Sequence, residues 1–224
     1  MSVTAITIPM MSAPVIKYHR AMGRWQPNAR GRLEQAALEL YVEQGFEQTT
    51  VAEIARRAGL TERTFFRHFA DKREVLFWGA SALQDLVVSA VAAAPDSAVP
   101  LEAVAAGLEA AAGLVQQRGE VARKRQTVIA AHAELREREL IKLASLASAI
   151  ADALRRRGVL EPVASLTAEA GVAVFRIAFA RWIDAIDSQH LSDIIRDTLD
   201  ELKVVTAGGR NGRTSKPRPA RAAR

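Results

Sequence analysis

Residues 49–77 read TTVAEIARRAGLTERTFFRHFADKREVLF, and this stretch decides the fold of the N-terminal part of the chain. Val51 and Ile54 recur with helical spacing and are followed by Gly59, which allows the chain to reverse tightly. Thr61 then precedes a second, shorter helical segment. The order helix, glycine turn, short helix predicts a helix-turn-helix, in which the second helix presents polar side chains to the major groove of DNA.

The same stretch, with the helix and the Gly45-Phe46 pair before it, resembles the DNA-binding domain of the TetR/AcrR family of one-component regulators. With the preceding helix included, the match covers about 45 residues, and its most specific part runs from Thr49-Thr50 through Ala58-Gly59-Leu60 and Lys72 to Phe77. The resemblance implies that the short helix enters the groove and that its neighbours contact phosphates. The residues it assigns to DNA are Thr50, Glu62, Arg63, Thr64, Phe66, Arg67, His68 and Lys72.

These residues have different implied roles. Arg63 suits a bidentate contact to guanine O6 and N7, and Glu62 either accepts from a cytosine amino group or caps its helix. Thr50, His68 and Lys72 match positions that contact phosphate in the family, and the alternative for His68 is a surface residue without a partner. Lys72 is placed in the first turn of the next helix, whose N–H groups favour an anion.

One residue departs from the family pattern. Phe66 stands where a tyrosine is usual. Its ring suits a sugar or a thymine methyl group, but it has no hydroxyl to donate to a phosphate. The neighbouring Arg67 is the expected substitute for that hydrogen bond. Arg56 and Arg57, on the preceding helix, are read as a solvated face rather than as DNA ligands.

Charge is distributed unevenly along the chain. Six of the 31 Lys and Arg residues lie in residues 207–224, which contain no acidic residue, so residues 1–206 hold 25 basic and 25 acidic side chains. Residues 1–32 also hold basic side chains and no acidic one. Basic ends favour nucleic acid, although a solvated end without a partner explains the tail as well. We expect a flexible basic arm over 1–28 and a disordered basic tail over 207–224.

Helical spacing and abundant alanine predict an all-α protein of about nine helices. An N-terminal three-helix DNA-binding domain is expected over residues 29–78, followed by a helical-bundle domain for ligand sensing and dimerisation over 79–206. The expected helices cover residues 30–44, 51–58, 62–68, 71–91, 101–117, 120–135, 137–157, 167–187 and 191–205.

The last two expected helices carry apolar stripes wider than one small core needs, together with small residues that allow close helix approach. The family resemblance implies that they pair with their copies in a homodimer. The alternative is that these stripes complete the core of a monomer. The expected dimerisation residues are Phe175, Trp182, Ile186, Ile194, Ile195, Leu199 and Leu202.

The same resemblance implies a pocket between the sensor helices for a small lipophilic effector. Arg125 and His132 lie seven residues apart on one expected helix face, where they could meet a carboxylate or phosphate. The alternative is an exposed Arg125 and a His132 whose polar atoms are satisfied within the core. The expected pocket residues are Leu114, Arg125, Val128, His132, Phe175, Phe179 and Trp182.

Several classes of protein are excluded by residue type. The absence of cysteine excludes disulfides and thiolate metal sites. The four histidines lack metal-ligand spacing, and no glycine-rich phosphate loop or nucleophile elbow occurs, so we expect no enzyme, cofactor or metal. We find no signal peptide and no apolar run of about 18 residues, which predicts a cytoplasmic protein without a membrane span.

The sequence therefore predicts a DNA-binding transcriptional regulator. The expected mechanism is a homodimeric repressor on a palindromic DNA operator that is released by a small-molecule ligand. The alternative is a nonspecific or architectural DNA-binding protein without a ligand.

Overall fold

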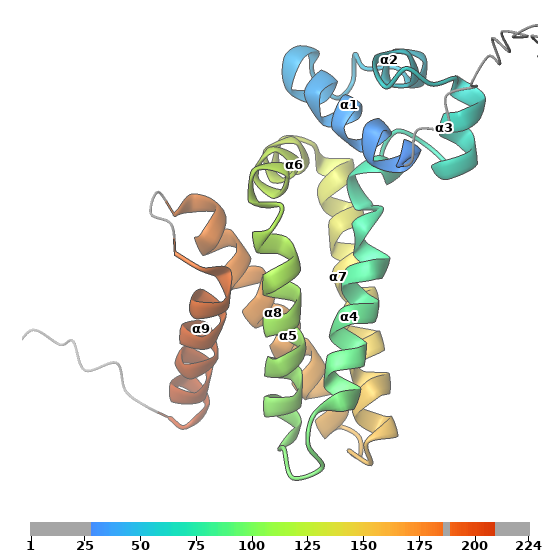
Figure 1. The fold of residues 1–224 in the computed structure, drawn as a ribbon. Coiled ribbons are helices and arrows are strands. Elements are labelled where there is room, and N and C mark those ends of the chain that lie inside the picture. The colour runs from blue at the N-terminus through green and yellow to red at the C-terminus, as the bar shows by residue number, and fades with distance from the viewer. Residues whose placement is uncertain (1–27, 186–188, 209–224) are drawn as a thin grey trace, which may run out of the picture.

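The computed structural model describes residues 28–185 and 189–208; the rest of the expected arm and tail, and Ile186, lie outside this range. The described part is all-α. Figure 1 shows α1, α2 and α3 as a head at one end of an elongated body built from the other helices. The elements are α1 (Ala29–Gln44), α2 (Val51–Arg57), α3 (Glu62–His68), the 3-10 helix η1 (Glu74–Phe77), α4 (Gly79–Ala93), α5 (Pro100–Gln116), α6 (Gly119–Ala131), α7 (Ala133–Arg156), α8 (Val163–Asp184) and α9 (Leu191–Thr206).

Three predicted helix boundaries are corrected. Helix α6 ends at Ala131 rather than at 135, because His132 adopts an extended conformation (φ −127°, ψ 123°) between α6 and α7. Helix α8 begins at Val163, directly after Pro162, and not at 167. The helix expected from 71 begins with η1 at Glu74, so Lys72 lies before the helix and not in its first turn.

The helix-turn-helix forms as local sequence predicts. Thr50 accepts a hydrogen bond from the backbone N–H of Glu53, and the Glu53 carboxylate accepts one from the backbone N–H of Thr50, which is a complete capping box. Gly59 has a φ of +63°, a backbone conformation that glycine adopts without strain. Thr61 caps α3 by accepting from the backbone N–H of Thr64.

The residues of the head do not cover its apolar core by themselves. Leu33, Ile54 and Phe65 are fully buried and form its centre. The same apolar cluster includes Val128 and Ile129 of α6, together with Leu135 of α7. The core of the head is therefore completed by residues far along the chain, which the body supplies.

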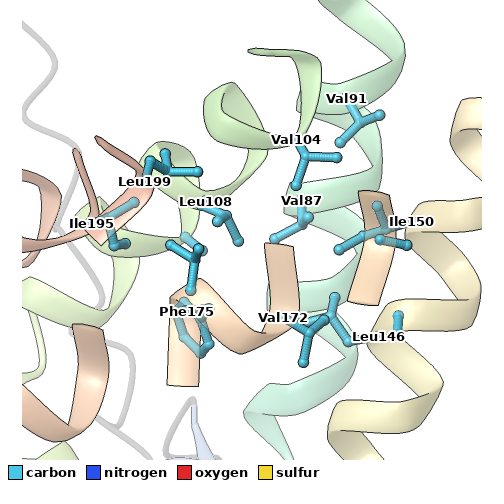
Figure 2. Packing of buried hydrophobic residues seen from close by; sticks show 14 of the residues in the cluster. Val87, Val91, Val104, Leu108, Leu146, Ile150, Val172, Phe175, Ile195 and Leu199 are labelled. Carbon is cyan, nitrogen blue, oxygen red and sulfur yellow. The ribbon is translucent and has the colours of Figure 1, made fainter. Parts of the chain in front are cut away.

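A second apolar cluster fills the body, where α5 packs against α4, α8 and α9. Figure 2 shows Val104, Leu108 and Phe175 among the side chains that meet there. Gly171 of α8 lies so close to α5 that a methyl group at this position would collide with a side-chain carbon of Val104. The two helices can approach this closely because position 171 has no side chain.

Two helical segments of the described chain are long and apolar enough to cross a membrane, residues Glu74–Ala93 and Val163–Asp184, where the sequence had predicted none. This criterion rests on length and composition alone, and core helices of soluble proteins also meet it. Both segments pack against other helices of the body in this structure.

Lys72 holds the turn between α1 and α2. Its ammonium group donates to the backbone carbonyls of Phe46, Glu47 and Thr49 at 2.8, 3.0 and 3.1 Å, and it lies 4.4 Å from the centre of the Phe46 ring. The backbone carbonyl of Lys72 accepts from the Tyr41 hydroxyl at 2.6 Å. Burial of that hydroxyl raises the pKa of Tyr41 far above its usual value. The Lys72 side chain therefore stabilises the turn that precedes Thr50.

Replacing Gly171 by Ala tests the contact between α8 and α5. We expect the free energy of unfolding to fall by about 1–3 kcal/mol, because the buried Val104 has little room to move. Gly113→Ala is the control, since no atom lies within 4 Å of the added methyl group. The control should gain about 0.5–1 kcal/mol from helix propensity. Urea denaturation of both variants checks this pair of values, and equal effects would contradict the packing.

Replacing Lys72 by Met tests these three hydrogen bonds to the turn. We expect the variant to lose about 2 kcal/mol of stability, because three backbone carbonyls lose a charged donor. Lys124→Met is the matched control, since that ammonium pairs only with the exposed Glu120 and should change stability by less than about 0.5 kcal/mol. Thermal and urea unfolding provide the readout. If the variant is as stable as wild type but binds DNA more weakly, then Lys72 contacts a phosphate, as the sequence predicted.

Candidate nucleic-acid interface and sensor cavity

Helix α3 presents one face to the core and the other to solvent. Phe65 is fully buried and contacts Phe69, with ring centres 5.5 Å apart. Glu62, Arg63, Phe66 and Arg67 are exposed, and Thr64 is half-buried. Figure 1 shows this helix at the outer edge of the head, away from the body. The exposed face is thus available to a large partner such as a DNA duplex.

Phe66 is the unusual member of this face. Its side chain is 56% exposed although it is fully apolar. Its ring meets the edge of Phe65, with ring centres 5.5 Å apart, which fixes it against the core residue beneath. A rigid, exposed aromatic ring beside Arg63 and Arg67 suits contact with an apolar part of a nucleotide.

His68 and Lys72 are placed differently from the other predicted DNA contacts. The Nε2 atom of His68 is buried and has no hydrogen-bond partner among the described residues. Burial lowers the pKa of His68, and the nearby Arg67 and Arg30 lower it further. The Lys72 ammonium is occupied by the three carbonyls described above. Neither side chain is therefore a free, exposed cation that is available to a phosphate.

The preceding helix supports the solvated reading of its arginines. Arg57 of α2 pairs with Glu43 of α1 through two hydrogen bonds of 2.7 and 3.0 Å and lies 3.5 Å from Glu39. These pairs raise the pKa of Arg57 and lower that of Glu43. Arg57 therefore ties α2 to α1, while Arg56 beside it is exposed.

Ion pairs join the head to the body along the start of α7. Arg73 contacts Asp71 and, at 3.3 Å, Glu134. Glu74 of η1 pairs with Arg138 and lies 3.8 Å from Lys142. These pairs surround the segment that links α3 to α4. The head and the body are therefore joined by charged contacts as well as by the shared apolar core.

A second junction joins α1 to the turn between α5 and α6. Glu34, a nearly buried carboxylate of α1, pairs with Arg118. The Arg118 guanidinium also lies over the Trp78 ring, 5.6 Å from its centre, and Arg30 lies 5.8 Å from the same ring. Arg125 of α6 donates to the backbone carbonyl of Leu76 at 2.6 Å and to Glu139 at 3.1 Å.

A large cavity adjoins this second junction. Its volume is about 1210 Å³, and it extends from α1 and Trp78 between α4, α5, α6, α7 and α8. Leu83, Leu143 and Phe179 belong to its apolar wall, whereas Glu34, Arg118 and Arg125 belong to its wall near the head. The cavity is open to solvent and has one apolar and one charged region.

The structure places four of the seven predicted pocket residues in this wall, namely Leu114, Arg125, Phe175 and Phe179. The other three lie elsewhere. Val128 belongs to the core that closes the head, and Trp182 is fully buried in the core of the body. His132 lies at the break between α6 and α7, where its ring packs 5.1 Å from that of Phe46 and its Nδ1 is 2.9 Å from the Val128 carbonyl.

Most of the predicted dimerisation residues are buried within the single chain. Ile186 lies outside the described residues, Leu202 is half-buried, and the remaining five are buried in the body. These five are Phe175, Trp182, Ile194, Ile195 and Leu199. The exposed apolar side chains of α8 and α9 are different ones: Val163, Leu166, Ile177, Val204 and Val205.

Sequence reasoning missed Glu34, Trp78 and Arg118. One signal was present, because Glu34 lies three residues before Ala37 and seven before Tyr41, both of which are buried. A carboxylate within an apolar stripe indicates a buried partner. The partner itself was not predictable, since Arg118 lies 84 positions away on a turn.

Comparisons with known proteins agree with this architecture. Residues 34–77 match the family model of the bacterial regulatory proteins of the tetR family. Residues 98–207 match the model of the MftR C-terminal domain. The first model covers most of the head and the second covers the body from the start of α5 onward, while α4 lies between the two matches. They place the helix-turn-helix and the helical domain after it in one known architecture.

Among curated proteins, the chain is similar to the HTH-type transcriptional regulator TcmR of Streptomyces glaucescens, with 40% identity over 87 residues. The aligned part is 39% of this chain and 38% of TcmR. The putative mycofactocin biosynthesis transcriptional regulator MftR of Mycobacterium tuberculosis is 36% identical over 58 residues, which are 26% of this chain and 29% of MftR. The chain thus spans well under half of the length of these relatives.

Among solved structures, a putative TetR-family regulator from Syntrophomonas wolfei superimposes with a TM-score of 0.61 at 15% identity, over 83% of this chain and 98% of that one. FadR of Thermus thermophilus, a TetR-family repressor solved in complex with lauroyl-CoA, gives a TM-score of 0.50 at 23% identity, over 87% and 100%. These likenesses show the fold. The family is not enzymatic. With its helix-turn-helix head and its MftR-like C-terminal domain, the chain belongs to the TetR family of DNA-binding transcriptional regulators.

Proposed function

We propose that this regulator is a cytoplasmic, ligand-responsive repressor that binds a palindromic DNA operator as a homodimer. The observation that carries the proposal is the exposed face of α3, which lies at the outer edge of the head and holds Arg63, Phe66 and Arg67. The DNA-binding domain covers residues 29–78 and the sensing and dimerisation domain covers 79–206.

Each exposed residue of α3 has a proposed role. Arg63 donates to O6 and N7 of a guanine, and Glu62 accepts from a cytosine amino group or stabilises the helix start. Phe66 contacts a thymine methyl group or a sugar. Arg67 and the exposed hydroxyl of Thr50 contact phosphates, and Thr64 lies beside them. We leave Lys72 and the buried Nε2 of His68 out of the direct contacts, because both are engaged or enclosed within the head.

The homodimer is proposed to form through the exposed side of α8 and α9. Leu166 and Ile177 of α8 are 65% and 47% exposed, and Val205 of α9 is 73% exposed. Ala170 and Ala173 lie between the two apolar residues of α8 and allow close helix approach. Burying this surface against a second copy is favourable, at about 25 cal/mol per Å² of apolar area. A two-fold dimer presents its two recognition helices about 34 Å apart, one turn of B-DNA.

The effector is proposed to bind in the cavity of about 1210 Å³. Helix α4 lines this cavity and directly follows η1, whose Val75, Leu76 and Phe77 belong to the apolar core of the head. A ligand that binds better to a conformer with a shifted α4 moves the two heads away from the operator spacing. The lauroyl-CoA complex of FadR supports a lipophilic molecule as a ligand of this fold.

Release is tested by titrating the operator-bound protein with candidate effectors and following DNA binding by fluorescence anisotropy. The expected result is a loss of operator affinity with at least one cavity ligand. If ligands bind the cavity and none changes operator affinity, the sensing part of the proposal is wrong.

Replacing Arg63 by Ala tests specific recognition. We expect the affinity for the operator to fall by about 1–3 kcal/mol, because one base pair loses its bidentate contact. Arg156→Ala is the control, since that arginine is exposed near the end of α7. Competition against random DNA completes the test. A specific regulator prefers its operator by about 10³ or more, and equal affinity for all sequences would favour an architectural DNA-binding protein instead.

Replacing Ile177 by Glu tests the dimer surface. We expect a folded monomer, because the side chain is half-exposed in the single chain and the new charge would face its own copy across the two-fold axis. Val42→Glu, at an equally exposed position of α1 in the head, should remain a dimer. Analytical ultracentrifugation measures both masses. A wild-type monomer, or an I177E dimer as tight as wild type, would contradict this interface.

A further inference from the structure

The cavity has two chemically distinct regions. Leu83, Leu143 and Leu146, with Phe175 and Phe179, form an apolar wall between α4, α7 and α8. The region next to the head contains Glu34, Trp78, Arg118 and Arg125 instead. A ligand that fills both regions is best stabilised if it is amphipathic, since a wholly apolar molecule would remove water from the charged groups without offering them a polar contact.

Glu34 contacts the guanidinium group of Arg118 at the head end of the cavity. It forms an ion pair with Arg118, and its charge also acts on Arg125, where it opposes the lowering of the pKa that burial causes. The Glu34 side chain is only 11% exposed, whereas that of Arg118 is 41% exposed. The cavity therefore offers access to the cation of this pair, while the carboxylate lies deeper against α1.

Several hydrogen-bond donors at this end of the cavity have no partner among the described residues. The Trp78 indole N–H is buried and has no partner among the described residues. Arg118 uses Nη2 for Glu34, and Arg125 uses Nε and Nη1 for Leu76 and Glu139. Within the described chain, Nη1 of Arg118 and Nη2 of Arg125 have no hydrogen bond. On the acceptor side, Oε1 of Gln126 is the buried side-chain atom of the cavity wall that lacks one.

We propose that the effector is an amphipathic anion whose carboxylate or phosphate replaces Glu34 on Arg118, with its aliphatic part against the apolar wall. This inference rests on the proposed ligand-responsive function and names the chemistry of its site. The exchange is direct competition between two anions for one guanidinium. It needs no new donor, because Arg118 keeps its place over the Trp78 ring.

The exchange acts on the head because Glu34 belongs to α1. Once Arg118 binds the ligand, the Glu34 carboxylate remains nearly buried without its partner, which is an unfavourable state for a charge. That state is relieved when α1 moves away and Glu34 becomes hydrated. The α5–α6 turn then no longer holds α1, and the head moves relative to the body. The ligand thereby favours the conformer that lacks the Glu34–Arg118 pair.

A charge series of ligands tests the proposal on the unmodified protein. Dodecanoate, dodecyl phosphate, dodecanol and dodecyltrimethylammonium share one tail and differ in the head group. Binding is measured by isothermal titration calorimetry of the full chain, below the micelle concentrations. We expect the two anions to bind at least about tenfold more tightly than the alcohol and the cation, since a charge-assisted hydrogen bond stabilises by about 1.5–3 kcal/mol. Equal binding of all four, or preference for the cation, overturns the proposal. The ratio between the two anions distinguishes a carboxylate from a phosphate ligand.

Two variants test the competition between Glu34 and the ligand. Glu34→Gln should bind the anions more tightly than wild type, because the internal competitor loses its charge. Arg118→Gln should remove the preference for anions over dodecanol, and Arg118→Lys should retain part of it. Arg156→Gln is the control and should leave the series unchanged. Weaker anion binding in E34Q, or an unchanged preference in R118Q, contradicts the exchange. The wild-type series decides the matter if a variant fails to fold.

The failure of this inference is distinguishable from failure of the proposed function. If neutral or cationic amphiphiles release the operator and anions do not bind, the ligand-responsive function stands and the anion exchange is wrong. If anions bind with the expected dependence on Arg118 but leave operator affinity unchanged, the site is right and the release mechanism is wrong.

Discussion

The rest of the structure depends on the apolar contact between the head and the body. Leu33, Ile54 and Phe65 form the centre of the head, but Val128, Ile129 and Leu135 of the body complete that core. A three-helix unit of this size buries too little apolar surface to be stable by a wide margin. Sharing a core with α6 and α7 supplies the missing contacts, and it also means that the head cannot change position without disturbing the helices that line the cavity.

Several ion pairs lie around this shared core, and each joins a particular segment of the head or linker to a particular segment of the body. Glu74 with Arg138 and Arg73 with Glu134 join the linker segment to α7, while Glu34 with Arg118 joins α1 to the α5–α6 turn. Partly exposed pairs of this kind stabilise a protein by little. They are better suited to selecting one arrangement of head and body, because a ligand with its own charge can compete for them. Apolar burial thus holds the two parts together, and the ion pairs determine their relative position.

In the body, helices α8 and α9 carry apolar residues on a buried inner face and on an exposed outer face. Most of the apolar stripe residues of α8 and α9 fill the core of the body within the single chain, among them Phe175, Trp182 and Ile195. What is left on the outside of α8 is a narrower set that includes Leu166 and Ile177, separated by alanines. In the proposed homodimer, α8 serves both a core and a dimer surface and therefore needs apolar residues on two faces, which accounts for a stripe wider than a single packing interface requires.

The sequence by itself determined the features that depend on near neighbours. The capping threonines, Gly59, the period of α1 to α3 and the exposed face around Arg63 are local, because helix caps and turns are satisfied within a few residues. Only the tertiary structure decided the rest. It assigned Lys72 to three carbonyls of the turn before Thr50, paired Glu34 with Arg118, and ended α6 at His132 against Phe46. The physical reason is that a periodic pattern shows which face is buried but not what covers it, and these partners are brought together only when α6 and α7 fold back onto the head.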